Sequence, residues 1–177
     1  MPTPPNGKTK KLLKGYYNKQ AHLKVISSNN NFKTQWNGIK DKKIECLVIN
    51  SHANPNELEF ATKATARTIT KKNIKRLIIL GCNAGHEDYC FTNISYLFRR
   101  KTKGPVVASD GTVYSYGSVQ ATESSTFTSK ADDTWKYWRN LQNCRRKKNE
   151  GWIQYDSCSV MTYFEKKKMT IKDMCEL

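Results

Sequence analysis

The chain has 177 residues, of which 37% are hydrophobic, and it carries a formal net charge of +16 from 31 Lys and Arg against 15 Asp and Glu. A chain of this size and composition can form one hydrophobic core without help from disulfides or metals. It contains no run of about 18 apolar residues, which excludes a transmembrane helix, and its first residues lack the apolar stretch of a signal peptide. We therefore expect a basic globular protein that is cytoplasmic, or secreted by a route that the chain does not encode.

The organisation expected from composition is simple. Residues 1–15 combine prolines and lysines with almost nothing to bury, which indicates a flexible basic leader. Residues 16–177 are expected to form a single α/β domain, without internal repeats. The six cysteines are irregularly spaced, which favours mostly reduced thiols over a disulfide framework.

In chain order, the first elements are a short strand over residues 22–27 and a helix over residues 32–39. Two clearer strands follow at residues 44–49 and 76–80, which are short, β-branched and mostly apolar. Such runs are typical of strands covered on both faces of a largely parallel sheet. Residues 62–75 are predicted to supply the crossover helix between them.

The pattern continues with a helix over residues 89–100 and a third core strand at residues 105–109. Residues 112–116 are expected to extend that strand as a hairpin. The Ser- and Thr-rich residues 117–129 indicate a surface loop, and residues 132–141 have the spacing of an amphipathic helix.

The C-terminal part alternates aromatic and apolar residues over 152–164, which predicts a final strand or hairpin. The lysine-rich end is expected to be a short helix or a frayed terminus.

Two polar residues stand where the clearest strands end. His52 follows the first of these strands and Cys82 follows the second. Functional groups in a parallel α/β sheet gather at the carboxyl ends of the strands, so these side chains are expected to lie close together. An imidazole beside a thiol is the arrangement that thiolate chemistry requires. Backbone amides at Cys82 and Ala53 are candidate donors to a developing oxyanion.

Three segments contain the predicted core strands and the residues that follow them: LVINSHA (residues 47–53), LIILGCNAG (residues 77–85) and GPVVASDGTVY (residues 104–114). They resemble the caspase-like cysteine peptidases, a group that includes caspases, clostripain, gingipains, separase and the self-processing domains of large bacterial toxins. Apolar strands ending in Ser-His-Gly, and in Gly-Cys or Ser-Cys followed by small residues, mark the family. The resemblance covers about residues 44–114, less than half of the chain.

The resemblance implies a three-layer caspase-like α/β domain with a mostly parallel central sheet. It also implies a cysteine peptidase, and therefore a hydrolase, with Cys82 as nucleophile, His52 as general base or proton donor, and no metal or organic cofactor. The chain departs from the family in two respects. Ala53 stands where the family usually has Gly, and the 30 residues between His52 and Cys82 (82 − 52) leave room for only a minimal crossover.

Acidic residues after the predicted strands suggest a substrate preference. Asp110, Glu57 and Asp88 fall in loops at the expected site end of a basic chain. An acidic rim there would favour Lys or Arg before the scissile bond of a protein or peptide substrate, including the chain itself. The alternative is that these carboxylates only cap helices and turns.

Other readings remain open at this point. Cys82, His86 and Cys90 have a spacing of four that would suit zinc ligands on a helix, but Gly85 and the absence of a fourth ligand argue against it. The alternative prediction is a catalytically inactive caspase-like module that binds nucleic acid or another polyanion through its basic blocks. By analogy with the toxin domains alone, an inositol phosphate or similar polyanion is a candidate activator.

Overall fold

The computed structural model describes residues 29–40, 44–86, 91–116, 125–131, 150–157 and 160–177. The helices are α2 (Asn29–Asn37), α3 (Lys63–Thr68), α4 (Ile94–Arg99) and α5 (Ile171–Glu176). The strands are β1 (Leu47–Asn50), β2 (Ala53–Asn54), β3 (Glu57–Leu58), β4 (Ala61–Thr62), β5 (Leu77–Leu80), β6 (Val106–Ser109), β7 (Thr112–Tyr116), β8 (Thr126–Lys130), β9 (Trp152–Tyr155), β10 (Met161–Phe164) and β11 (Lys168–Thr170).

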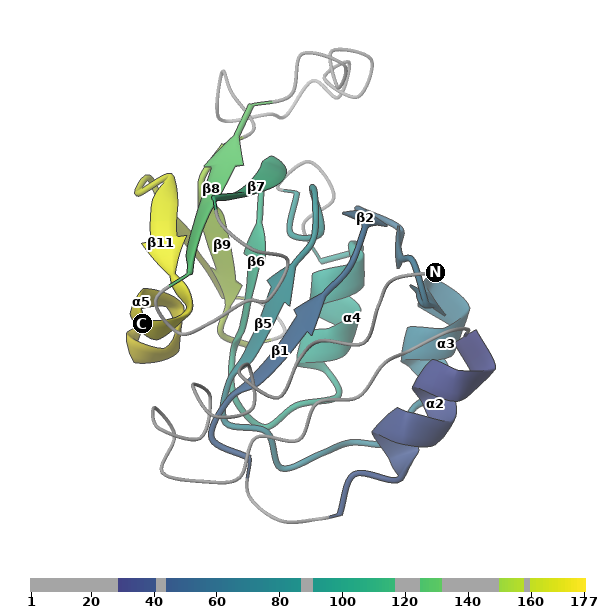
Figure 1. Cartoon of the computed structure of the whole chain (residues 1–177). Helices are drawn as coiled ribbons and strands as arrows, with labels where there is room; N and C mark the ends of the chain where they lie inside the picture. The colour runs from purple at the N-terminus through teal and green to yellow at the C-terminus, as the bar shows by residue number, and fades with distance from the viewer. Residues whose placement is uncertain (1–28, 41–43, 87–90, 117–124, 132–149, 158–159) are drawn as a thin grey trace.

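A five-stranded sheet of order β1-β5-β6-β9-β10 forms the centre of the fold. β1, β5 and β6 run parallel to one another, whereas β9 pairs antiparallel with both β6 and β10. The three parallel strands end at the same edge of the sheet, near β2 (Figure 1). The fold is therefore mixed α/β, as the sequence pattern indicates, and its central sheet is partly parallel where a mostly parallel sheet is expected from the sequence.

Alternate residues of β5 face opposite sides of this sheet, and both sides are buried. Leu77 and Ile79 belong to a core cluster that includes residues of α2, α3 and α4. Ile78 and Leu80 belong to a second cluster that includes Trp152 and residues of β8, β11 and α5. Burial on both faces explains why β5 reads as an uninterrupted apolar run.

Two smaller sheets complete the described part of the chain, one of order β11-β8-β7 and one of order β2-β3-β4. The first differs from the sequence-based expectation, because residues 112–116 pair with β8 rather than folding back on β6 as a hairpin. β8 itself lies in the segment expected to be a loop over residues 117–129. β8 includes the buried polar residue Ser129, and a hydrogen bond compensates for its burial, because Ser129 Oγ lies 2.6 Å from Ser109 Oγ.

The helices are shorter than the periodicity suggests. α3 covers only part of the predicted crossover helix over residues 62–75: it begins after the N-cap Thr62 and gives way to extended backbone at Ile69. The β-branched run at residues 68–70 disfavours continuation of the helix. α4 begins at Ile94 because the Asn93 side chain accepts a hydrogen bond from the Tyr96 amide and caps the helix.

The C-terminal part agrees with expectation, because residues 152–164 contain the β9–β10 hairpin and the chain ends in the short helix α5.

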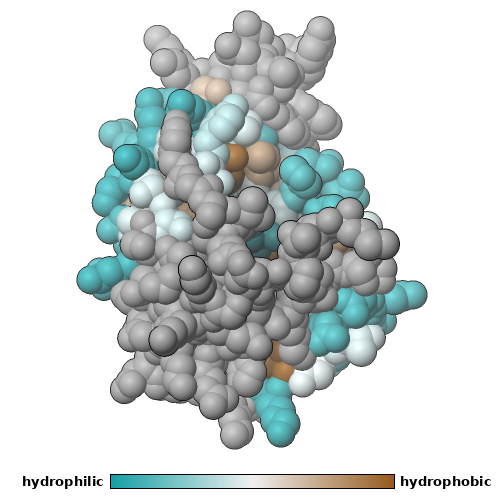
Figure 2. Space-filling model, in the orientation of Figure 1, coloured by the Kyte–Doolittle hydropathy of each residue, from teal (hydrophilic) through white to brown (hydrophobic). Residues whose placement is uncertain are grey.

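The leader at residues 1–15, the strand expected at residues 22–27 and the helix expected at residues 132–141 lie outside the described residues. No helix in the described segments is long and apolar enough to cross a membrane. On the face shown in Figure 2, the described residues at the left and right edges are mostly hydrophilic.

Candidate functional site

His52 and Cys82 occupy equivalent positions after neighbouring parallel strands. β1 and β5 pair in a register that sets Asn50 opposite Leu80, and each functional residue follows two positions later. The pairing continues past the strand ends, since the Ser51 amide donates to the Leu80 carbonyl oxygen at 3.4 Å. The two residues expected from the sequence to form a site therefore lie in adjacent loops at one edge of the sheet.

A close approach of the two loops depends on a glycine. A Cβ atom added to Gly81 would lie 2.5 Å from Ala53 Cβ and 3.1 Å from the Ser51 carbonyl oxygen. Separations this short do not occur between ordinary side chains, so the residue before Cys82 must lack a side chain. Ala53, at which the chain departs from the caspase-like pattern, thus packs its methyl group against the backbone that leads into Cys82.

The Cys82 thiol is half-buried and has one hydrogen-bond donor beside it. The Val113 amide donates to Cys82 Sγ at 3.4 Å. This contact joins the Cys82 side chain to the start of β7. Within the described part of the chain, no hydrogen-bond acceptor is bound to the Cys82 amide, so that N–H is available to a bound substrate.

His52 is exposed, and its backbone is held by hydrogen bonds. Its carbonyl oxygen accepts hydrogen bonds from the Glu59 amide and from Ser51 Oγ, both at 2.9 Å. Among the residues that the structure describes, neither Cys82 nor any other residue forms a hydrogen bond with the His52 imidazole. Hydrogen bonds between catalytic groups commonly tighten only when substrate binds, so the absence of such a bond among the described residues does not argue against a dyad.

The loop from Cys82 to His86 is held on both sides by hydrogen bonds. On the side of β6 and β7, the Asn83 amide donates to the Gly111 carbonyl oxygen at 2.8 Å. The Gly85 amide donates to the Ser109 carbonyl oxygen at 2.9 Å. Asn83 has a positive φ of 55°, which turns the backbone sharply after Cys82.

Side chains from other elements bind the carbonyl oxygens of the same loop. Ser95 Oγ donates to Ala84 at 2.8 Å, and Tyr155 Oη donates to Gly85 at 3.1 Å. Asn93 Nδ2 donates to the carbonyl oxygen of His86 at 3.2 Å. These contacts satisfy a polar loop that would otherwise be costly to bury, and they hold Cys82 in one position.

Asp110 and His86 form a buried pair behind this loop. Asp110 Oδ1 lies 3.6 Å from His86 Nδ1, and the two side chains are 1% and 3% exposed. The Asp110 amide also donates to the Gly151 carbonyl oxygen at 3.0 Å. Asp110 is thus not on the exposed acidic rim expected from the sequence, because its carboxylate faces the interior, toward His86.

Sequence reasoning missed this pairing because it considered the two residues for different roles, His86 as a zinc ligand and Asp110 as a substrate contact. The signal that was available is positional: Asp110 follows the strand adjacent to β5, at the same edge as the Cys82 loop.

The other acidic candidates are placed differently. Glu57 is exposed on β3, where its Oε1 lies 3.4 Å from Asn54 Nδ2, and β3 pairs with the β2 strand that begins at Ala53. Asp88 lies outside the described residues. Glu57 is therefore the one of these three carboxylates that the structure describes at the surface.

The proposed zinc ligands are only partly described. Cys90 lies outside the described residues, while Cys82 and His86 lie on a turn rather than on one helical face. No group of three His, Cys, Asp or Glu side chains suited to a metal occurs in the described ranges.

A comparison of the chain with protein-family models, with curated proteins and with solved structures finds no match. Any statement about activity therefore depends on the residues and the geometry of this chain.

Proposed function

We propose that the chain is a cysteine endopeptidase or self-processing protease of caspase-like, three-layer architecture, with His52 and Cys82 as its catalytic dyad. The parallel register of β1 and β5, which brings His52 and Cys82 to equivalent positions in adjacent loops, is the observation that carries the proposal. A rigid Cys82 loop beside an exposed imidazole is what a nucleophile and its base require.

In the proposed reaction, His52 accepts the thiol proton and the Cys82 thiolate attacks the carbonyl carbon of the scissile peptide bond. The carbonyl oxygen becomes an oxyanion, for which the amide of Cys82 and the backbone at Ala53 are the candidate donors. The Asn83 amide is already bonded to Gly111 and does not contribute. Collapse of the intermediate breaks the C–N bond, and the imidazolium gives its proton to the leaving amine. Water then hydrolyses the acyl-enzyme with His52 as base.

The proposed substrates are proteins or peptides with Lys or Arg before the scissile bond, including this chain itself. Glu57 supports this preference, because it is exposed on the strand that pairs with β2 directly after His52. The burial of Asp110 against His86 supports a role in holding the Cys82 loop. The proposed chemistry needs no cofactor, and activation by an inositol phosphate is a separate proposal made by analogy.

The test begins with a limiting amount of a thiol-reactive probe near neutral pH, applied to the wild type and to His52→Ala, with the labelled cysteine located by mass spectrometry. We expect Cys82 to label at least about tenfold faster than Cys46 and Cys175, because only Cys82 has an activating base nearby. Cys46 and Cys175 are also half-buried thiols outside any disulfide, so they serve as internal controls. The preference for Cys82 should disappear in His52→Ala.

Cleavage is then measured on Lys and Arg peptides, with and without inositol hexakisphosphate, for the wild type and for Cys82→Ala. Hydrolysis that Cys82→Ala abolishes supports the proposal. Uniform labelling without hydrolysis would overturn it. Salt-steep binding of nucleic acid that survives Cys82→Ala would favour the inactive binding module instead.

A further inference from the structure

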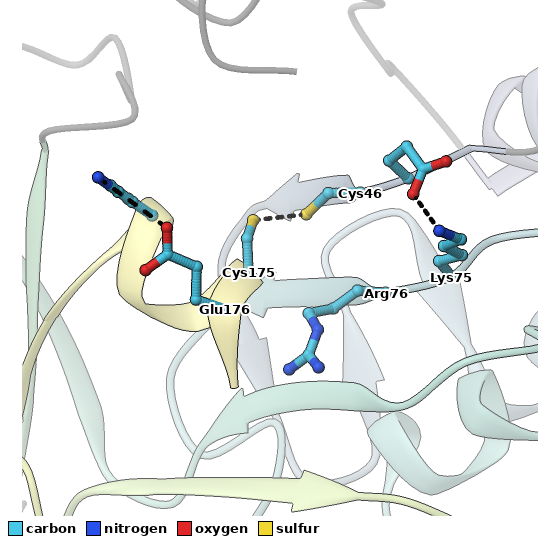
Figure 3. A pocket seen from close by; sticks show the side chains of 7 residues that line it. Cys46, Lys75, Arg76, Cys175 and Glu176 are labelled. Carbon is cyan, nitrogen blue, oxygen red and sulfur yellow. Dashed lines mark hydrogen bonds and ion pairs between the residues drawn. The ribbon is translucent and has the colours of Figure 1, made fainter. Parts of the chain in front are cut away.

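Two thiols face each other at the opposite end of β1 from His52. Cys46 immediately precedes β1 and Cys175 lies on α5, 129 positions later in the chain. Their sulfur atoms are 2.9 Å apart and point toward one another (Figure 3). A disulfide bond is about 2.0 Å long, so the two sulfurs are within about 1 Å of bonding distance.

A small molecule can reach this pair. Both cysteines are half-buried and line a pocket of about 550 Å³. Its other lining residues are charged: Lys75, Arg76 and Lys172 against Glu45 and Glu176. The pocket therefore combines two accessible sulfur atoms with an excess of positive charge.

Arg76 contributes a positive charge that no carboxylate neutralises within the described part of the chain. Its Nη1 donates to Gln154 Oε1 at 2.8 Å and to the Met174 carbonyl oxygen at 3.2 Å, both uncharged acceptors. Lys75, in contrast, lies 2.7 Å from Glu45. Arg76 thus adds an unneutralised positive charge to the pocket that the two thiols line.

We propose that Cys46 and Cys175 are a redox site, which forms a reversible intramolecular disulfide by exchange with a small disulfide such as oxidised glutathione. One protein thiolate attacks a sulfur of the small disulfide and displaces one small thiolate, which leaves a mixed disulfide. The second protein thiolate then attacks the protein sulfur of that mixed disulfide and displaces the second small thiolate. The protein loses two electrons and two protons, and the small disulfide becomes two thiols.

The bond would fasten α5 to the residue that leads into β1. Among the strands of the described residues, β1 is the first in the order of the central sheet and pairs with β5 alone. Joining two residues 129 positions apart removes much of the freedom of the unfolded chain, and disulfides of this kind stabilise strongly. This inference is independent of the proposed peptidase activity.

The test uses the full chain, incubated with oxidised or reduced glutathione, followed by alkylation of free thiols and peptide mapping. In the oxidised wild type we expect a peptide that joins Cys46 to Cys175, a mass decrease of about 2 Da and a rise in Tm of roughly 5–10 °C, all reversed by a dithiol reductant. Cys82→Ser should behave in the same way, because Cys82 lies at the other end of the sheet. Cys46→Ser and Cys175→Ser should show neither the cross-linked peptide nor the rise.

The wild-type peptide map alone decides the matter, whether or not the serine variants fold. A stable mixed disulfide at either cysteine without closure would overturn the proposal, as would a bond from either one to Cys82. A cross-link that forms without any rise in Tm would overturn its stabilising role.

Discussion

At the scale of single residues, the contact between Gly81 and Ala53 controls how closely the two candidate catalytic loops approach. A methyl group at position 81 would sit 2.5 Å from the methyl group of Ala53, so one loop would have to move. The resemblance in sequence identified Ala53 as a departure from the caspase-like pattern. The structure shows what that departure does, because it makes a glycine at position 81 necessary.

We predict that Gly81→Ala lowers the free energy of unfolding by about 1–3 kcal/mol, the usual cost of overpacking. The same substitution should reduce the preferential labelling of Cys82, because it separates His52 from the thiol. The double variant Ala53→Gly, Gly81→Ala should recover part of both losses, since the remaining neighbour, the Ser51 carbonyl oxygen, is at the milder distance of 3.1 Å. Denaturant unfolding and mass-spectrometric labelling provide the two measurements.

Ala53→Gly alone is the matched control and should change labelling little, because removal of a methyl group opens space without a clash. If Gly81→Ala matched the wild type in both measurements, the two loops could not be as close as the structure has them.

At the scale of elements, sequence patterns succeed where one strand carries its own signal. β1, β5 and β6 were predictable because strands covered on both faces are short, apolar and β-branched. β8 was not, because its segment reads Thr-Phe-Thr-Ser-Lys and has one apolar side chain, Phe127, to bury. It is a strand because β7 and β11 pair with it on both sides, which is information that no local window contains.

The C-terminal helix depends on a reciprocal cap at its first turn. Thr170 Oγ1 accepts from the Asp173 amide at 3.0 Å, and Asp173 Oδ2 accepts from the Thr170 amide at 2.8 Å. The hydrogen bond from the Thr170 backbone lowers the pKa of Asp173 below its ordinary value. The cap thereby holds Ile171 and Met174 in the core and keeps Cys175 beside Cys46.

We predict that Asp173→Asn destabilises the protein by about 0.5–1 kcal/mol at neutral pH, as loss of a helix cap does. Because the pKa of Asp173 is lowered by folding, the carboxylate favours the folded state above its ordinary pKa of about 4, and this contribution is lost as the pH falls through the lowered value. The difference in Tm between wild type and variant should be constant from about pH 5 to pH 8 and should shrink below about pH 4.

Glu176→Gln is the matched control, because it removes an exposed carboxylate from the same helix but from outside the cap; its Oε1 lies 3.9 Å from Lys172 Nζ. An equal loss of stability in both variants would mean that general charge, rather than the cap, is responsible.

At the scale of the whole molecule, the sequence predicted the neighbouring positions of His52 and Cys82 better than it predicted what surrounds them. Two strand ends in one parallel sheet are enough to bring His52 and Cys82 to one edge, since parallel strands share the direction of their carboxyl ends. The burial of Asp110 against His86 required knowing that β6 lies directly beside β5 and that β9 covers the other side of β6. Such neighbour relations arise from long-range pairing and have no local signature.

The net charge of +16 predicts a further property of the whole chain, namely that its stability rises with ionic strength. Like charges repel most strongly in the compact state, and salt screens that repulsion over a distance of about 8 Å at physiological ionic strength. The described ion pairs act in the opposite direction, but several join exposed side chains, as Lys166 with Asp173 at 3.5 Å does, and exposed pairs contribute little.

Raising NaCl from about 10 mM to about 300 mM should therefore raise Tm by roughly 2–4 °C. Differential scanning fluorimetry in two sodium salts with different anions at equal ionic strength separates screening, which is the same in both salts, from binding of a particular anion. A fall in Tm would show that favourable ion pairs outweigh the repulsion and that the basic residues are arranged for pairing within the chain rather than for attracting an anionic partner.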